Sequence, residues 1–92
     1  MTETAIITLT NGSLSDYEDA LAQVRTYLQG AEHCYSFSLL HNEDQAQRYT
    51  MYTSWETQLH RVGAWDYFIT TFADAGVEVN VTLEAQGVQQ VA

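Results

Sequence analysis

The stretch Arg48–Ala75, RYTMYTSWETQLHRVGAWDYFITTFADA, decides the fold of this 92-residue chain. Residues 48–54 alternate bulky and smaller polar side chains and are rich in β-branched and aromatic types, which is typical of a β-strand. Trp55 and Glu56 end this strand and lead directly into an amphipathic segment, predicted as a helix from about Glu56 to Ala75. The rest of the chain supplies partners for this strand–helix pair.

The helix predicted for residues 56–75 has one apolar face. At 100° per residue, seven side chains fall in one arc about half the circumference wide: Leu59, Val62, Trp65, Phe68, Ile69, Phe72 and Ala73. The opposite face is predicted to carry His60, Ala64, Tyr67, Thr71 and Asp74. We interpret Gly63 as a point where this helix approaches the sheet closely.

Towards the N-terminus, a strand is predicted for residues 4–10, which are β-branched and end at Asn11-Gly12. A helix follows up to Gly30, with Ser13 or Ser15 as its N-cap, and Ser15 with Glu18 has the spacing of a capping box.

Two more strands complete the pattern. In residues 34–40, Tyr35, Phe37 and Leu39 are predicted on one face. The turn at 42–45 indicates an antiparallel hairpin with the strand from Arg48. Residues 77–84 alternate without error between apolar and polar. Residues 85–92 show no clear period, and we expect them either to frame a partner's edge or to fray.

The order β-α-β-β-α-β predicts one α+β domain over residues 1–92. With right-handed crossovers it gives a ferredoxin-like, four-stranded antiparallel sheet with both helices on one face. The bare face would show rings such as Tyr35 or Tyr49, depending on the register. We therefore expect a homodimer that pairs two sheets face to face as a dimeric α+β barrel.

Composition excludes several kinds of partner. Twelve acidic residues against three arginines give a formal net charge of -9, which repels nucleic acids and anionic membranes.

Cys34 is the only cysteine, so no intrachain disulfide forms, which fits a reducing compartment. No basic region followed by an apolar run is visible near the N-terminus, so we expect no signal peptide, and no apolar run approaches the roughly 20 residues that span a bilayer. We expect a cytoplasmic protein.

Three groups of residues resemble the antibiotic biosynthesis monooxygenase family. They are Asn11-Gly12 before the first helix, Cys34-Tyr35 opening the second strand, and Tyr49-Thr-Met-Tyr-Thr-Ser-Trp-Glu56 leading into the second helix. The resemblance covers most of the chain and implies a dimeric α+β barrel. It also implies the activities of the family, which include cofactor-free oxygenation of quinols and aromatic polyketides, and haem degradation.

The sequence departs from two catalytic branches of that family. The haem-degrading branch has an Asn in the first strand, a Trp in the second helix and a His further along it. Trp65 matches the Trp, but residues 5–10 contain no Asn and the helix has no His after Trp65. Haem degradation is therefore disfavoured. The Asn, Trp and Arg pattern of the polyketide oxygenases is also incomplete.

Cofactor-free oxygenation requires a base that ionises a phenol or enol, and a dry, aromatic-lined pocket. The first candidate base is Asp66, which has apolar neighbours at helical spacing; desolvation would raise its pKa unless it is paired. The alternative is a structural carboxylate that pairs with a strand or an arginine. The second candidate is His41 at the exit of its strand, where a histidine is also common as plain surface.

The candidate substrate-binding residues are aromatic: Trp65, Phe68, Phe72 and Tyr52. Trp65 heads the apolar arc and could stack on a planar substrate, although rings at helical spacing are also typical of a core. Tyr49 and Tyr52 face opposite sides of their strand, so one is predicted on the helix side and the other at the dimer interface.

Two functions remain open. The first is a homodimeric, cofactor-independent monooxygenase acting on a small aromatic, quinol or polyketide-type substrate. The second is a non-catalytic dimeric barrel that binds a hydrophobic small molecule or serves as an assembly module. No metal is expected at His33 and Cys34, because they are adjacent in a strand-like segment and point to opposite faces. No cofactor is expected, since the sequence has neither a Gly-rich phosphate loop nor a CxxC motif.

Overall fold

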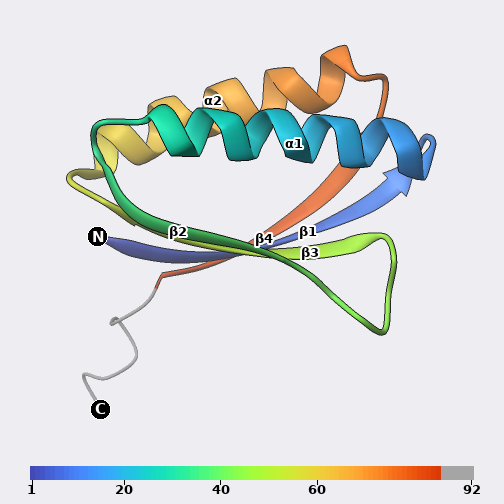
Figure 1. The fold of residues 1–92 in the computed structure, drawn as a ribbon, viewed down its shortest axis with the longest axis horizontal. Helices are drawn as coiled ribbons and strands as arrows, with labels where there is room; N and C mark the ends of the chain where they lie inside the picture. The colour runs from blue at the N-terminus through green and yellow to red at the C-terminus, as the bar shows by residue number, and fades with distance from the viewer. Residues whose placement is uncertain (86–92) are drawn as a thin grey trace.

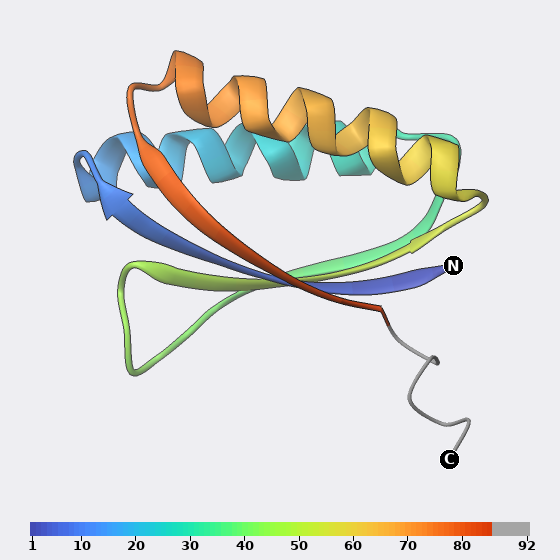
Figure 2. The same ribbon diagram turned by 180° about the vertical axis from the view of Figure 1, so that it is seen from behind.

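A computed structural model of the protein describes residues 1–85. The elements follow in the order β1 (Thr2–Asn11), α1 (Leu14–Gly30), β2 (Cys34–His41), β3 (Arg48–Trp55), α2 (Gln58–Asp74) and β4 (Glu78–Ala85). Both helices lie against one face of the sheet, so the domain has two layers (Figure 1). The reverse view shows the sheet's other face free of helices within the described chain (Figure 2). The prediction for the tail concerns residues outside the described range.

The sheet has the strand order β2-β3-β1-β4, with every neighbouring pair antiparallel. Ile7 of β1 lies opposite Tyr49 of β3 on one side and Val81 of β4 on the other. This confirms the predicted ferredoxin-like fold, including the hairpin of β2 and β3. None of the helices in the described part is long and apolar enough to cross a membrane.

The helix starts are set by side-chain caps. Ser13 caps α1, because its Oγ accepts a hydrogen bond from the backbone N–H of Asp16 at 3.0 Å. The capping box predicted for Ser15 and Glu18 is wrong, since Ser15 already lies in the first helical turn. Thr57 caps α2 by accepting from the backbone N–H of His60 at 3.3 Å.

The predicted core face of α2 is partly wrong. Trp65, Phe68 and Phe72 are buried as expected, but the outer members of the arc are exposed: Leu59 at 82%, Ile69 at 60% and Val62 at 43%. Ala64 and Thr71, predicted on the solvent side, are buried. The helix is turned towards α1, because Tyr67 stacks on Tyr27 with ring centroids 4.5 Å apart. Contact with a second helix thus shifts the face that the sheet alone would select.

The two faces of the sheet differ in character. Tyr49 faces the helices and packs edge-on against Tyr17 at 5.8 Å, whereas Tyr52 lies on the open face. Phe37 and Leu39 share one face as predicted, and this face packs against the core beneath the helices. Tyr35 does not follow them, because a bulge between Cys34 and Ser36 interrupts the alternation and leaves Tyr35 exposed.

Replacement of Gly12, in the turn after β1, is predicted to destabilise the protein. Its φ of +114° favours glycine, and an added Cβ would lie 2.8 Å from Cγ1 of Val77. We expect Gly12→Ala to lower the free energy of unfolding by about 1–3 kcal/mol. Gly63→Ala is the matched control: no neighbour lies within 4 Å of its Cβ, contrary to the predicted close approach, so it should stabilise α2 by about 0.5–1 kcal/mol. Urea unfolding of both variants measures the difference, and equal effects would contradict this account.

Stability is predicted to fall at alkaline pH. Tyr17 is fully buried and donates a 2.7 Å hydrogen bond to the carbonyl of Ile7, and burial raises its pKa. Burial, followed by the nearby Glu18, also raises the pKa of Tyr49. Because the folded pKa exceeds the unfolded value of 10.0, this stability is complete below pH 10 and is lost as pH rises further.

Urea unfolding between pH 9 and 11 tests this behaviour. One proton contributes a slope of at most about 1.4 kcal/mol per pH unit. Tyr17→Phe should flatten the slope and should lower stability at pH 8 by about 1 kcal/mol, through loss of the hydrogen bond to Ile7. The chain has no lysine to titrate in this range. An unchanged slope in Tyr17→Phe would show that Tyr17 is not responsible.

Candidate functional site

The predicted site residues are not brought together by the fold. Asp66 lies on the exposed side of α2 and not in a buried apolar stripe. His41 lies at the exposed end of β2, where its Nε2 is 3.1 Å from the carbonyl of Ala46 and its ring stacks on Tyr49 at 4.7 Å. The catalytic roles of both residues stay predictions.

The predicted binding residues are also dispersed. Trp65 and Phe68 pack in the core beneath α2, with their rings 5.3 Å apart. Phe72 is buried too and borders a groove between α2 and β4. Tyr52 instead lines a depression of about 380 Å³ that also includes Ser36 and Ser38. Their part in substrate binding also stays a prediction.

A buried polar cluster connects β1 to α2. The carboxylate of Glu3 accepts hydrogen bonds from Trp65 Nε1 at 2.7 Å and from an Arg61 guanidinium nitrogen at 2.8 Å. The side chains of Glu3 and Arg61 are only 6% and 15% exposed. Trp65 is therefore held by a carboxylate in the core, which explains its fixed place without any ligand.

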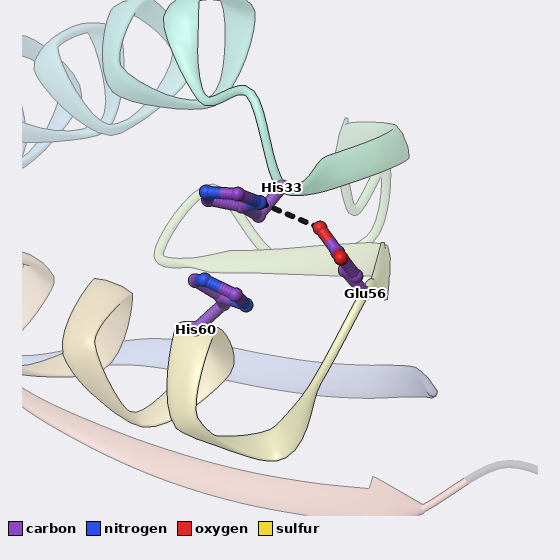
Figure 3. Close-up of side chains that lie close together, drawn as sticks. All are labelled: His33, Glu56 and His60. Atoms are coloured by element: carbon purple, nitrogen blue, oxygen red, sulfur yellow. Dashed lines mark hydrogen bonds and ion pairs between the residues drawn. The ribbon is translucent and has the colours of Figure 1, made fainter.

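A second cluster forms where the hairpin meets the start of α2. Cys34 pairs with Trp55 across β2 and β3, and just beyond this pair the backbone N–H of Glu56 donates to the carbonyl of His33 at 2.8 Å. The side chains of these two residues meet as well: His33 Nδ1 lies 2.6 Å from Glu56 Oε2. His60, in the first turn of α2, stacks on the His33 ring with centroids 3.7 Å apart and 18° between planes (Figure 3).

The contact with Glu56 defines which tautomer a neutral His33 adopts. An ionised carboxylate only accepts hydrogen bonds, so Nδ1 of His33 is the nitrogen that donates to Glu56, and in the neutral tautomer with this proton Nε2 has a free lone pair. In Figure 3 the other ring nitrogen of His33 lies away from Glu56. The His60 ring is fixed by its own contact, with Nδ1 2.7 Å from Thr57 Oγ1. The cluster therefore presents an oriented imidazole base backed by a carboxylate.

The imidazoles border an aromatic pocket. It has a volume of about 190 Å³ and is lined by Tyr27, Ala31, Glu32, His33, Trp55 and His60. Trp55 is only 2% exposed and forms the floor, whereas His33 and Glu32 are exposed and lie at the mouth. The base is thus placed at the entrance of a pocket with an apolar floor.

The same three side chains have the composition of a metal site, since His33, Glu56 and His60 offer ligand atoms within 4.8 Å of one another. The lone pairs of an imidazole lie in the plane of its ring. Because the two rings are stacked nearly parallel, these lone pairs run side by side and do not converge on one ion. The geometry favours proton transfer over metal coordination.

The sequence held one signal for this cluster that our prediction did not use. In an antiparallel hairpin the residue before the first strand meets the residue after the second, which places His33 beside Glu56. His60 follows Glu56 by four residues, but helical spacing predicts it on the face of α2 opposite the apolar arc. Nothing in the sequence indicates that Glu3 is buried, because an acidic residue near the start of a strand is usually exposed to solvent.

The strand order, the helix layer and the pocket define a ferredoxin-like α+β domain with one open sheet face. The family model for antibiotic biosynthesis monooxygenases matches residues 1–66, which include His33, Glu56 and His60, and the chain belongs to this family. No curated protein matches the sequence.

Three solved structures with this fold share little sequence with the chain. SnoaB, a cofactor-independent oxygenase from Streptomyces nogalater, has a TM-score of 0.65 at 17% identity, with 91% of this chain and 89% of SnoaB covered. PA3566 from Pseudomonas aeruginosa has a TM-score of 0.71 at 14% identity and coverages of 92% and 91%. Rv0793 from Mycobacterium tuberculosis has 0.68 at 14%, with 91% and 92% covered. Such identities establish the fold alone.

Proposed function

We propose that the protein is a cofactor-independent monooxygenase that acts on a single-ring phenol or quinol. The observation that carries this proposal is the 2.6 Å contact between His33 Nδ1 and Glu56 Oε2 at the mouth of the aromatic pocket. Membership of the family supports the type of reaction. The cofactor-independent oxygenase SnoaB, which has the same fold, shows that the fold is compatible with this chemistry.

The first step is ionisation of the substrate. The ring hydroxyl transfers its proton to Nε2 of His33, and Glu56 stabilises the imidazolium through the Nδ1–H hydrogen bond. The product is an electron-rich phenolate, which gives electrons to oxygen far more readily than the phenol does. The stack with His60 keeps the His33 ring in place during this transfer.

The second step is oxygenation, with the substrate as the only source of electrons. A ring carbon forms a bond to O₂, and the peroxide takes up the proton held by His33. That carbon then loses its hydrogen as a proton, the O–O bond breaks, and hydroxide leaves to become water. A quinol, C₆H₆O₂, and O₂ thus give a hydroxyquinone, C₆H₄O₃, and H₂O. One oxygen atom enters the ring and the other is reduced to water.

The pocket volume restricts the substrate to one ring. An apolar cavity of about 150 Å³ is sufficient to bind benzene. The pocket of about 190 Å³ therefore accommodates one substituted ring between Tyr27 and Trp55, but not a fused polyketide. Aromatic side chains provide the apolar, stacking surface that such a ring requires.

An oxygen electrode tests the proposal directly. With metal chelator present, we expect the protein to consume one O₂ per single-ring quinol, above the rate of spontaneous oxidation, and to form a quinone absorbance. A three-ring polyketide should give no added consumption. Binding of the quinol without oxygen uptake would contradict the proposal and would favour a non-catalytic barrel of the same family.

We also propose that two copies pair through the open sheet faces. This face carries Tyr52 and Leu40, which are 45% and 55% exposed and would be covered by a second copy. The aromatic pocket lies on the helix side and remains accessible in such a dimer. Sedimentation in dilute buffer should give a dimer, and Tyr52→Asp should give a folded monomer. A wild-type monomer would contradict this arrangement.

A further inference from the structure

The mouth of the aromatic pocket carries an acidic side chain that has no basic partner. Among the residues that line the pocket, Glu32 is the acidic one, and none is a lysine or an arginine. Glu32 is exposed, and the ion pairs among residues 1–85 involve Glu56 and Glu3 instead. The charge of Glu56 is balanced when His33 accepts a proton. The mouth is therefore left with the uncompensated negative charge of Glu32.

The three arginines of the chain are engaged elsewhere. Arg61 pairs with Glu3, and Arg25 donates to a backbone carbonyl of β2 at 3.2 Å. Arg48 begins β3, whereas the pocket lies at the other end of that strand, beside Trp55. The chain has no lysine. An anionic group on a ligand would therefore find no guanidinium or ammonium at the pocket with which to pair.

We propose that the single-ring substrate carries a cationic substituent, such as an alkylammonium group, and that Glu32 selects for it. This rests on the proposed function, which places the ionising hydroxyl beside His33, the neighbour of Glu32 at the mouth. The hydroxyl and the cation then leave the ring on the same side, so the substituent is ortho or meta to the hydroxyl. A para substituent would point towards the apolar floor at Trp55, where a charge is costly to bury.

A cation at this place also fits the ionisation step. Transfer of the hydroxyl proton to His33 leaves a phenolate at a mouth that already carries the carboxylates of Glu32 and Glu56. An ammonium group on the substrate offsets the repulsion between these charges, whereas a carboxylate on the substrate adds to it. The charge of the substituent thus acts on binding and on ionisation in the same direction.

Anaerobic binding of phenols of similar shape tests the inference without turnover. Calorimetry at low salt and neutral pH should give wild-type affinities that fall in the order 3-(aminomethyl)phenol, 3-(hydroxymethyl)phenol, 3-hydroxybenzoate. The cation should bind about threefold more tightly than the neutral compound, as expected for an exposed ion pair. It should also bind more tightly than its para isomer, 4-(aminomethyl)phenol. High salt should remove the preference over the neutral compound, because exposed charges are screened.

Glu32→Gln keeps the size of the side chain and removes its charge, so the affinity for the cation should fall to that of the neutral phenol. Glu43→Gln is the matched control and should keep the threefold preference. Glu43 follows β2 by two residues and Glu32 precedes it by two, so they lie at opposite ends of this strand.

Two results would overturn the inference: equal wild-type affinities for the cation and the neutral phenol, or a preference that persists in Glu32→Gln. Loss of the preference in both variants would assign it to the net charge of the chain, and a tighter fit of the para isomer would place the cation at the floor; each contradicts the inference as well. Oxygen uptake is measured separately with an uncharged quinol, so the proposed function can hold where this inference fails.

Discussion

His33→Asn is expected to lower kcat for a single-ring quinol by at least about 100-fold, the contribution typical of a positioned general base. The asparagine amide still donates to Glu56, but it has no lone pair basic enough to take the substrate proton. Glu56→Gln should lower kcat less, because His33 remains and loses only the carboxylate that orients it and stabilises its imidazolium. Steady-state oxygen uptake across a substrate series gives kcat and KM separately.

The free energy of unfolding should hardly change in His33→Asn and Glu56→Gln. The side chains of His33 and Glu56 are 47% and 44% exposed, and such pairs contribute about 0–1 kcal/mol. Glu43→Gln, which removes a carboxylate from the exposed turn after β2, is the control for lost charge. Asp66→Asn and His41→Asn test the two bases predicted from the sequence, and both variants should keep turnover if His33 is the base. Full turnover in His33→Asn, or its loss in Asp66→Asn, would contradict the assignment.

Arg61→Ala is expected to lower the free energy of unfolding by about 3–5 kcal/mol, which is the usual effect of leaving one partner of a buried ion pair alone. Without Arg61, the carboxylate of Glu3 stays in the core with only the Trp65 indole as a partner among the described side chains. Urea unfolding at neutral pH measures the loss.

A double variant separates this effect from loss of packing. In Glu3→Gln with Arg61→Met no charge is buried, and the glutamine oxygen still accepts from the Trp65 indole. Replacing a buried ion pair by neutral groups of similar volume is often neutral or stabilising. The double variant should therefore recover most of the stability. A loss below about 1 kcal/mol in Arg61→Ala would show that the pair is effectively solvated.

The sequence predicted the fold well because periodicity is a local property. Alternation in 77–84 and helical spacing in α2 specified the elements, and connection lengths specified the hairpin. The buried face of α2 depended on a distant contact, the stacking of Tyr67 on Tyr27 of α1. The alternation of faces along β2 is interrupted at Tyr35 by a β-bulge, which the residue pattern does not indicate.

The site was less predictable, because its residues are ordinary when taken one at a time. His33 lies in a short link, Glu56 follows a strand, and His60 appears on a polar face; only the register of β2 and β3 brings them together. The apolar neighbours of Asp66 predicted a desolvated carboxylate, yet Leu59, Val62 and Ile69 are all exposed. A carboxylate beside an apolar stripe marks a base only where the stripe is buried.

Ionisation of a bound phenol tests the central claim most directly, because it monitors the proton transfer to His33 without oxygen. 4-Nitrophenol is a suitable single-ring probe, since its phenolate absorbs at a longer wavelength than the phenol. Titrated anaerobically into the wild type at a pH where the free probe is mostly protonated, it should bind with a rise in phenolate absorbance. His33→Asn should bind the probe without that rise. The same rise in both proteins would show that His33 is not the base.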